Sequence, residues 1–297
     1  MELRDIEIFL TLADELHFGR TAERLHVSPS RVSQAIRAQE AEIGAPLFTR
    51  TSRRVTLTRV GETLRAGLRP AFDRIETSVS EARTAAREDS QTLTIGVMGA
   101  QAHDLVPVLE ALRATHPLAE VRFREAFYGD PFGPLRHDEV DLMINWLPVD
   151  EPDLSVGCVL REEPLNLAVS SRHPLAGRET VSLEDLGDFA VPDIVAPDTW
   201  LAGAMPTETP SGRPIRRGPT VSTYSEVLAV VADSEVVCPV PDEGRRYYPW
   251  PGVRYVPIRD APPVRWALLR RTARTPRPIT RTFIAIAERV RQELEGA

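Results

Sequence analysis

The sequence has no lysine, only two cysteines and few aromatic residues, which make up 6% of the chain. All 36 basic side chains are therefore arginine, and against 43 Asp and Glu they leave a formal net charge of −7. Cys158 and Cys238 are 80 residues apart, and neither stands in a CxxC pair or beside a histidine at metal-ligand spacing. The sequence therefore predicts no zinc site and no disulfide framework, but two buried thiols in a reducing cytoplasm.

Long apolar runs and catalytic motifs are also absent from the sequence. No apolar stretch approaches the roughly 20 residues of a membrane-spanning helix, and MELRDIEIFLTLADEL at the N-terminus is acidic where a signal peptide is basic. There is no GxSxG, HExxH, P-loop or GxGxxG pattern, and the Glu162–Glu163 pair lies in apparent loop sequence without a partner base. We therefore expect a cytoplasmic protein without a membrane partner, cofactor, metal or catalytic residue.

The net charge is unevenly distributed along the chain. A total of −7 would argue against a nucleic-acid partner if it were evenly spread, because phosphate binding relies on clustered positive charge. Residues 1–90 are neutral, however, and residues 20–59 carry eight arginines against three glutamates. Only three of the 26 prolines precede residue 91. This pattern predicts a compact, helical, locally basic unit ahead of a larger acidic region with many loops.

Three short helices are predicted at the N-terminus. The first has an apolar stripe at three- and four-residue spacing, formed by Leu3, Ile6, Phe9, Leu10, Ala13 and Leu16. A second fits RTAERLH, with Ala22 and Leu25 turned inward. The third begins after Ser28, a natural N-cap, and ends before Gly44. We expect its buried edge to consist of Val32, Ile36 and Ile43. Three helices with a tight turn between the last two indicate a helix-turn-helix.

The opposite face of the third helix is polar and positively charged. Such a face can read base edges in a major groove, although an ordinary solvated helix face has the same composition. The following segment, LFTRTSRRVTLT (47–58), has two β-prone arms around an arginine-rich tip, which favours a wing that meets phosphates or a minor groove. The predicted DNA-binding residues are Ser28, Pro29, Ser30, Arg31, Ser33, Gln34 and Arg37 of the helix, and Arg50, Arg53 and Arg54 of the wing.

A long amphipathic helix is predicted from Arg59 to about Glu88. Its apolar positions follow a near-heptad spacing, which favours pairing with a second copy over packing on its own domain. The predicted dimerisation residues are Leu64, Leu68, Ala71, Ile75, Val79 and Ala82.

These N-terminal motifs resemble those of a known family. FGRTAERLHVSPSRVSQAIRAQEAEIGAPLFTRTSRRVTLTRVGETL (18–64) resembles the N-terminal domain of LysR-type transcriptional regulators, and EEPLNLAVSSRHPLAGRETVSLEDL (162–186) resembles their effector-binding part. The resemblance implies a winged helix-turn-helix over residues 1–58, a linker helix over 59–89 and a sensor domain over 90–297. The family often has Gln-Pro after the capping serine and Arg after Ser33, whereas this sequence has Pro29, Ser30 and Gln34 at these positions. It also departs at Gln39, in place of leucine, which we expect at the edge of the core with its amide turned outward.

The acidic region alternates strands with helices. Strands are predicted at 92–99, 120–128 and 139–146, around a helix at 102–116, and further strands in PLNLAVS, FAVPDI, EVVCPV and VRYVPI. The strand VRWALLRR (264–271) and the last helix, 279–294, return to the first part. This alternation predicts a parallel α/β sheet with its ligand crevice at the carboxyl ends of the strands. The resemblance implies two lobes similar to type 2 periplasmic binding proteins, lobe I over 90–160 and 262–297 and lobe II over 161–261.

A small-molecule effector is expected between these lobes. Gln101 and His103 stand where the family often has Ser or Thr for a carboxylate, which favours an aromatic or amide-bearing effector. The predicted effector-binding residues are Ala100, Gln101, Ala102, His103, Phe127, Tyr128, Asn145, Trp146, Ile194, Val195, Ser222, Thr223 and Pro241.

Together these features predict a transcriptional regulator that binds an interrupted dyad in double-stranded DNA as a homodimer. The resemblance further implies a homotetramer and contact with RNA polymerase. Two alternatives remain at this point. One is a receptor or enzyme whose N-terminal helices only mediate assembly, and the other is a nonspecific architectural DNA-binding protein.

Overall fold

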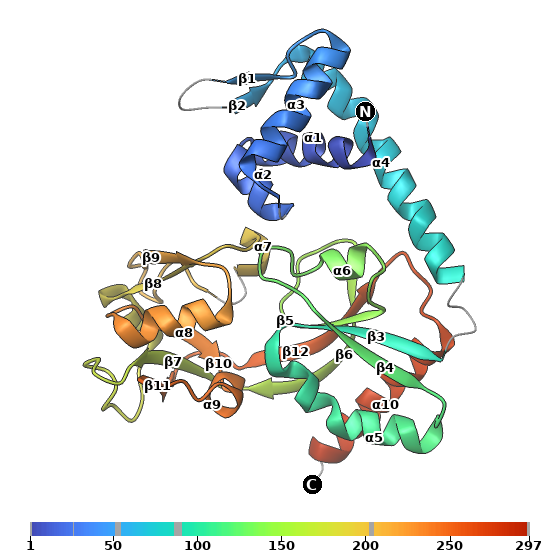
Figure 1. The fold of residues 1–297 in the computed structure, drawn as a ribbon. Helices are drawn as coiled ribbons and strands as arrows, with labels where there is room; N and C mark the ends of the chain where they lie inside the picture. The colour runs from blue at the N-terminus through green and yellow to red at the C-terminus, as the bar shows by residue number, and fades with distance from the viewer. Residues whose placement is uncertain (1, 26, 51–54, 86–90, 202–204, 296–297) are drawn as a thin grey trace. The chain divides into compact units, whose positions relative to one another are not determined.

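A computed structural model describes residues 2–25, 27–50, 55–85, 91–201 and 205–295 (Figure 1). The chain divides into two compact units, Met1–Ala86 and Arg87–Ala297. The first unit is mainly helical and the second mixes helices with strands, so the α plus α/β fold class is confirmed.

The first unit is a winged helix-turn-helix with a long terminal helix. Its elements are α1 (Leu3–Glu15), α2 (Phe18–Arg24), α3 (Pro29–Ile43), the antiparallel hairpin β1 (Phe48–Arg50) and β2 (Val55–Leu57), and α4 (Arg59–Ala85). Ser28 caps α3 as predicted, because its hydroxyl accepts a hydrogen bond from the Arg31 amide at 3.2 Å. Gly44 ends α3 with a φ of +79°, a conformation that favours glycine.

The apolar core of this unit differs from the predicted stripe at its edges. Ile8 and Leu12 are fully buried, because α1 packs against α2, α3 and α4 at once. Leu3, Leu16 and Ile43, which were expected to be inward, are exposed because they lie at helix ends beyond these contacts. Ala22 and Leu25 are buried as predicted.

The expectation for Gln39 is wrong. Its side chain is 1% exposed, and its Nε2 donates a hydrogen bond to the Asp5 carbonyl at 2.8 Å. The amide therefore turns inward and joins α3 to the start of α1 through a second hydrogen bond to that carbonyl, which a leucine could not make.

Lobe I of the second unit is built on a five-stranded sheet with the order β4-β3-β5-β12-β6. Its elements are β3 (Thr92–Val97), the 3₁₀ helix η1 (Gly99–Leu105), α5 (Val106–Thr115), β4 (Glu120–Glu125), α6 (Gly133–Arg136), β5 (Leu142–Leu147), β6 (Leu154–Glu163), β12 (Val264–Arg271) and α10 (Pro278–Glu295). Helices α5 and α10 lie side by side (Figure 1). Together with the sheet they bury a core that includes Ile95, Leu268 and Phe283.

Lobe II holds β7 (Leu165–Ser170), η2 (Leu183–Asp188), β8 (Ala190–Ile194), α7 (Asp198–Leu201), β9 (Arg216–Val221), α8 (Tyr224–Asp233), β10 (Cys238–Pro241), α9 (Glu243–Tyr247) and β11 (Val253–Pro257). Its core includes Leu167, Val191 and Val231. The chain passes between the lobes after β6 and again between β11 and β12.

Several sequence expectations for this unit need correction. Only β3, β4 and β5 run parallel in lobe I, whereas β12 pairs antiparallel with both β5 and β6, and the β10-β7-β11 sheet is antiparallel throughout. Strand β9 was missed because RRGPTV has a glycine, a proline and two arginines, and most of it is exposed. Strand β6 was also missed, so Glu162 and Glu163 end a strand and do not lie in a loop. The predicted 102–116 helix is divided into η1 and α5, because Pro107 fits the start of a helix but not its interior.

Both cysteines are buried and unpaired, as expected, and burial raises the pKa of each thiol to about 12. Within the described ranges, none of the helices is both long and apolar enough to cross a bilayer. No group of three or more His, Cys, Asp or Glu side chains among the same residues has the arrangement of a metal site.

Candidate nucleic-acid interface and effector site

The amino-terminal turn of α3 presents exposed hydroxyl groups. Ser28, Pro29 and Ser30 are all exposed, and the Ser28 and Ser30 hydroxyls lie 2.8 Å apart. One turn later Gln34 is exposed and Ser33 is half-buried. Arg37 is exposed, and its Nε donates to the Ser33 carbonyl at 3.3 Å. This face therefore offers hydroxyl, amide and guanidinium groups to a partner outside the unit.

Arg31 has a partner inside the unit. Its Nη2 lies 2.8 Å from Oδ1 of Asp5, and the Arg31 side chain is 41% exposed. Asp5 thus holds α3 twice, through this ion pair and through the bond from Gln39 to its carbonyl. Sequence analysis missed Asp5, because the contacts join positions 26 and 34 residues apart.

The wing is attached to α3 by a carboxylate. Glu40 Oε1 accepts hydrogen bonds from the amides of Leu47 at 2.9 Å and Phe48 at 3.3 Å, which sets where β1 begins. The start of α4 also packs closely against the segment before β1, because a Cβ atom at Gly61 would lie 2.2 Å from the Leu47 carbonyl oxygen. Arg50 ends β1, whereas Arg53 and Arg54 lie outside the described residues.

The predicted dimerisation stripe on α4 has two parts. Leu64 and Leu68 pack, half-buried, against the core of their own unit, together with Phe72. Beyond them Ile75 is 43% exposed and Val79 is 45% exposed. Ala71 and Ala82 are exposed as well. The carboxyl-terminal half of α4 therefore carries an apolar stripe that its own unit leaves uncovered.

The predicted effector-binding residues 100–103 form one wall of the expected site, at η1. Most of them make contacts within the chain. Gln101 is 2% exposed, and its Oε1 accepts a hydrogen bond from the Met98 amide at 2.9 Å. Ala102 packs against the lobe I core, whereas His103 is exposed, with its ring 5.2 Å from the Tyr247 ring. The Tyr248 hydroxyl lies so close to η1 that a Cβ on Gly99 would be 2.2 Å from it.

Three other predicted effector-binding residues meet around a tryptophan of lobe II. The Trp200 ring centroid lies 4.0 Å from that of Trp146 and 5.2 Å from that of Tyr128. Asn145 is fully buried, and its Oδ1 accepts hydrogen bonds from the Trp146 amide at 2.8 Å and Trp200 Nε1 at 3.1 Å. Because two donors fix Oδ1, the other end of the amide is Nδ2, and it has no hydrogen-bond partner among the described residues. Sequence analysis missed Trp200, whose only signal was a tryptophan in a loop-like APDTWL segment.

The remaining predicted effector-binding residues lie at other places in the two lobes. Ser222 and Thr223 are exposed at the start of α8, where the Thr223 hydroxyl caps the helix by accepting from the Glu226 amide at 3.2 Å. Phe127 is 60% exposed and Val195 is 42% exposed. The half-buried residues are Ile194 in β8 and Pro241 in β10.

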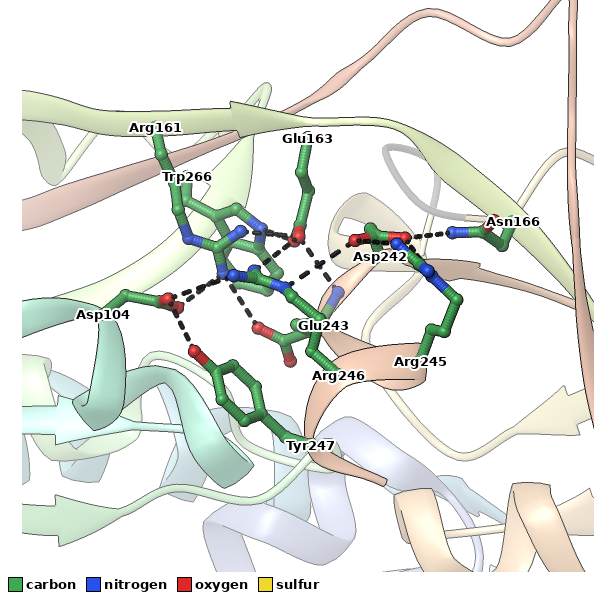
Figure 2. A network of polar contacts seen from close by, with 10 residues as sticks. All are labelled: Asp104, Arg161, Glu163, Asn166, Asp242, Glu243, Arg245, Arg246, Tyr247 and Trp266. Atoms are coloured by element: carbon green, nitrogen blue, oxygen red, sulfur yellow. Dashed lines mark hydrogen bonds and ion pairs between the residues drawn. The ribbon is translucent and has the colours of Figure 1, made fainter. Parts of the chain in front are cut away.

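Between the lobes lies a polar network that sequence analysis did not predict (Figure 2). Arg161 of β6 is ion-paired with Asp104 of η1 at 2.8 Å, Glu163 at 2.6 Å and Glu243 of α9 at 3.1 Å. Arg246 of α9 reaches Glu163 at 3.1 Å. The partners are up to 143 residues apart, as in the bond from the Tyr247 hydroxyl to Asp104 Oδ1 at 3.1 Å.

This network perturbs the titration of one of its carboxyl groups. Burial and the nearby carboxylates of Glu163 and Asp104 raise the pKa of Glu243 to about 7, against the opposing effect of Arg161. Glu163 also accepts hydrogen bonds from the Glu243 amide at 3.0 Å and from Trp266 Nε1. The lobe contact therefore contains a carboxyl group that gains or loses a proton near neutral pH.

Comparisons with known proteins agree for both units. Residues 3–62 match the model of the bacterial regulatory helix-turn-helix proteins of the lysR family, and residues 86–292 match the LysR substrate binding domain. The chain is 32% identical over 201 residues to the HTH-type transcriptional regulator AlsR of Bacillus subtilis, covering 67% of this chain and 66% of that protein. It is 33% identical over 202 residues to the HTH-type transcriptional regulator IlvY of Escherichia coli, covering 66% of each. These matches span just under two thirds of the length of each relative.

Solved structures show the same fold. A full-length OxyR variant of Pseudomonas aeruginosa matches with a TM-score of 0.51 and 26% identity, covering 97% of this chain and 99% of that one. Full-length BenM matches with a TM-score of 0.52 and 21% identity, covering 100% of this chain and 97% of that one. From its helix-turn-helix to its two-lobed carboxyl-terminal unit, this chain belongs to the LysR family of bacterial regulatory proteins.

Proposed function

We propose that the protein is a sequence-specific DNA-binding transcriptional regulator whose activity changes when a small-molecule effector binds between the lobes. The observation that supports this function best is the exposed polar turn of α3 beside the β1–β2 hairpin, in a unit that matches the family's DNA-binding model. In this proposal Ser30, Ser33, Gln34 and Arg37 meet base edges and phosphates, and the wing arginines meet the backbone.

The proposed DNA-binding form is a dimer. Ile75 and Val79 lie on the uncovered half of α4, so a second copy can bury them by pairing the two helices. A two-fold dimer would place one α3 in each half-site of an interrupted dyad. In this proposal, assembly to a tetramer, contact with RNA polymerase and action in the cytoplasm on the nucleoid follow the family's mode of regulation.

The proposed effector site lies beside η1 and the Trp200 cluster. Asn145 Nδ2 is a buried donor without a partner among the described residues, so an effector with a hydrogen-bond acceptor would satisfy it. An effector that prefers one arrangement of the lobes would change the dimer geometry and so the affinity for DNA.

A gel shift tests the DNA-binding proposal. The full chain is titrated against the intergenic DNA next to its own gene, because such regulators often act beside their own genes, with unrelated DNA of equal length as competitor. We expect a retarded band that the unrelated DNA does not compete away, and Arg37→Ala should weaken it, whereas Arg113→Ala on the exposed surface of α5 should not. Equal competition by both DNAs would favour the architectural alternative, and absence of a band would favour the assembly alternative.

A further inference from the structure

Helix α9 joins lobe II to the predicted effector wall of lobe I through several independent contacts. The Tyr247 hydroxyl donates to Asp104 of η1 at 3.1 Å, and the Tyr248 hydroxyl packs on Gly99 at the other end of η1, where a Cβ atom would lie 2.2 Å from it. Glu243 reaches Arg161, which also holds Asp104. One short helix of lobe II is therefore connected to both ends of η1.

The charges in this contact do not balance when every group is ionised. Among the described residues, the carboxyl groups of Asp104, Glu163 and Glu243 are ion-paired only with the guanidinium groups of Arg161 and Arg246, as Figure 2 shows. A fourth carboxylate, Asp242, pairs with Arg245 of α9 at 2.9 Å and lies 3.7 Å from Arg246, so the wider group still has one carboxyl group more than it has guanidinium groups. Glu163 is 5% exposed, so an unbalanced negative charge here is poorly solvated.

Within the described part of the chain, other elements around Glu243 contribute no compensating cation. The titratable side chains that interact with it from outside β6, η1 and α9 are Tyr128 after β4, Tyr224 of α8 and the Tyr248 phenol. On η1 itself, the ring of His103 lies 5.2 Å from that of Tyr247. Burial raises the pKa of all three phenols, so they remain neutral at physiological pH. One added proton would therefore balance the cluster of three carboxyl and two guanidinium groups.

We propose that Asp104, Arg161, Glu163, Glu243, Arg246 and Tyr247 form a proton-dependent latch that fastens α9 to η1 and is tightest when the cluster carries one proton. Loosening the latch releases η1, and with it the wall formed by Ala100, Gln101, Ala102 and His103. The arrangement of the effector site then depends on pH as well as on the effector. This inference concerns contacts within the chain, and its test uses no effector, so its failure would leave the proposed regulatory function untouched.

Hydrogen exchange measured by mass spectrometry on the full chain tests the latch, because exchange reports local opening of each segment. With the pKa of Glu243 at about 7 when latched, opening of both η1 and α9 should be about ten-fold more frequent at pH 8 than at pH 6, after correction for the chemical exchange rate. Glu243→Gln should remove this difference, since a neutral amide can keep the bond to Arg161. Tyr247→Phe should speed exchange in both segments at both pH values.

Glu162→Gln provides the matched control, because Glu162 lies beside Glu163 on β6 but is exposed and pairs with Arg265 at 3.3 Å, outside the latch. This variant should leave the hydrogen exchange of η1 unchanged at both pH values. Equal opening at pH 6 and pH 8 in the wild-type chain would overturn the proton dependence. Faster exchange of α9 alone in Tyr247→Phe would overturn the latch itself, and that variant decides the question even if Glu243→Gln does not fold.

Discussion

The exposed half of α4 makes a quantitative prediction about assembly. Replacing Ile75 and Val79 with glutamate should convert the proposed dimer to a monomer. The two sites are chosen because Ile75 is 43% exposed and Val79 is 45% exposed, whereas Leu64 and Leu68 pack on their own unit and their replacement would disrupt its core.

The size of the effect follows from the exposed surface. Full burial of an isoleucine or valine side chain stabilises by about 1.5–3 kcal/mol, and somewhat under half of each side chain is still exposed. Each side chain therefore has roughly 1 kcal/mol left to gain, and a two-fold dimer contains two copies of each, or about 4 kcal/mol in all. At about 1.4 kcal/mol per factor of ten, the double variant should raise the dimer dissociation constant roughly thousand-fold.

Sedimentation equilibrium of the full chain measures this constant directly. The control is Ser78→Glu, which adds a charge to the same exposed stretch of α4 without removing apolar surface. Ser78→Glu should raise the dimer dissociation constant much less than the double variant does. An unchanged dissociation constant for Ile75→Glu with Val79→Glu would refute the assignment of this stripe to the dimer.

Three further predictions concern stability. Gln39→Ala should destabilise the first unit by about 1 kcal/mol, because it removes the added hydrogen bond to the Asp5 carbonyl, as measured by thermal unfolding followed by circular dichroism. Trp200→Ala should cost about 3–5 kcal/mol in urea unfolding, and more than Trp250→Ala, because Trp200 is 4% exposed whereas Trp250 is half-buried. The pKa of Glu243 is raised from 4.5 to about 7 in the folded chain, so its protonation stabilises the fold by up to about 3 kcal/mol below pH 4.5, and this contribution is lost as the pH rises through 7. Every tryptophan lies in the second unit, so unfolding followed by tryptophan fluorescence reports the stability of that unit alone. This stability should fall with rising pH in the wild-type chain and in Glu162→Gln, but not in Glu243→Gln.

The first unit could be predicted closely from the sequence because its signals are local. Ser28 and Gly44 mark the ends of α3 through bonds to residues at most four positions away. What could not be predicted were the contacts of Asp5 with Arg31 and Gln39, which depend on how α1 packs across α3. The sequence alone does not distinguish a glutamine whose amide turns toward solvent from one whose amide donates to a buried carbonyl.

The second unit was less predictable because its sites depend on long-range pairing. Asn145 and Trp146 were identified from their place at the end of β5, but Trp200, which packs on them, comes from the other lobe. The latch also depends on long-range pairing. Sequence analysis places Glu163 in a loop, whereas in the fold it ends β6, which pairs with β12, and lies near α9. Alternation of strands and helices predicted most of the elements but missed β6 and β9, and it carries no information on the direction of β12.

Sequence-specific DNA reading by α3 is the central claim, and a hydroxyl-radical footprint on the intergenic DNA beside the gene tests it most directly. The wild-type chain should protect two short sites whose centres are one or more helical turns apart, about 10 base pairs per turn. Gln34→Ala should lose roughly ten-fold or more of the preference for these sites over unrelated DNA, as expected for about 1–3 kcal/mol of base discrimination. Protection spread evenly along the DNA, or a Gln34→Ala variant that keeps the full preference, would contradict it.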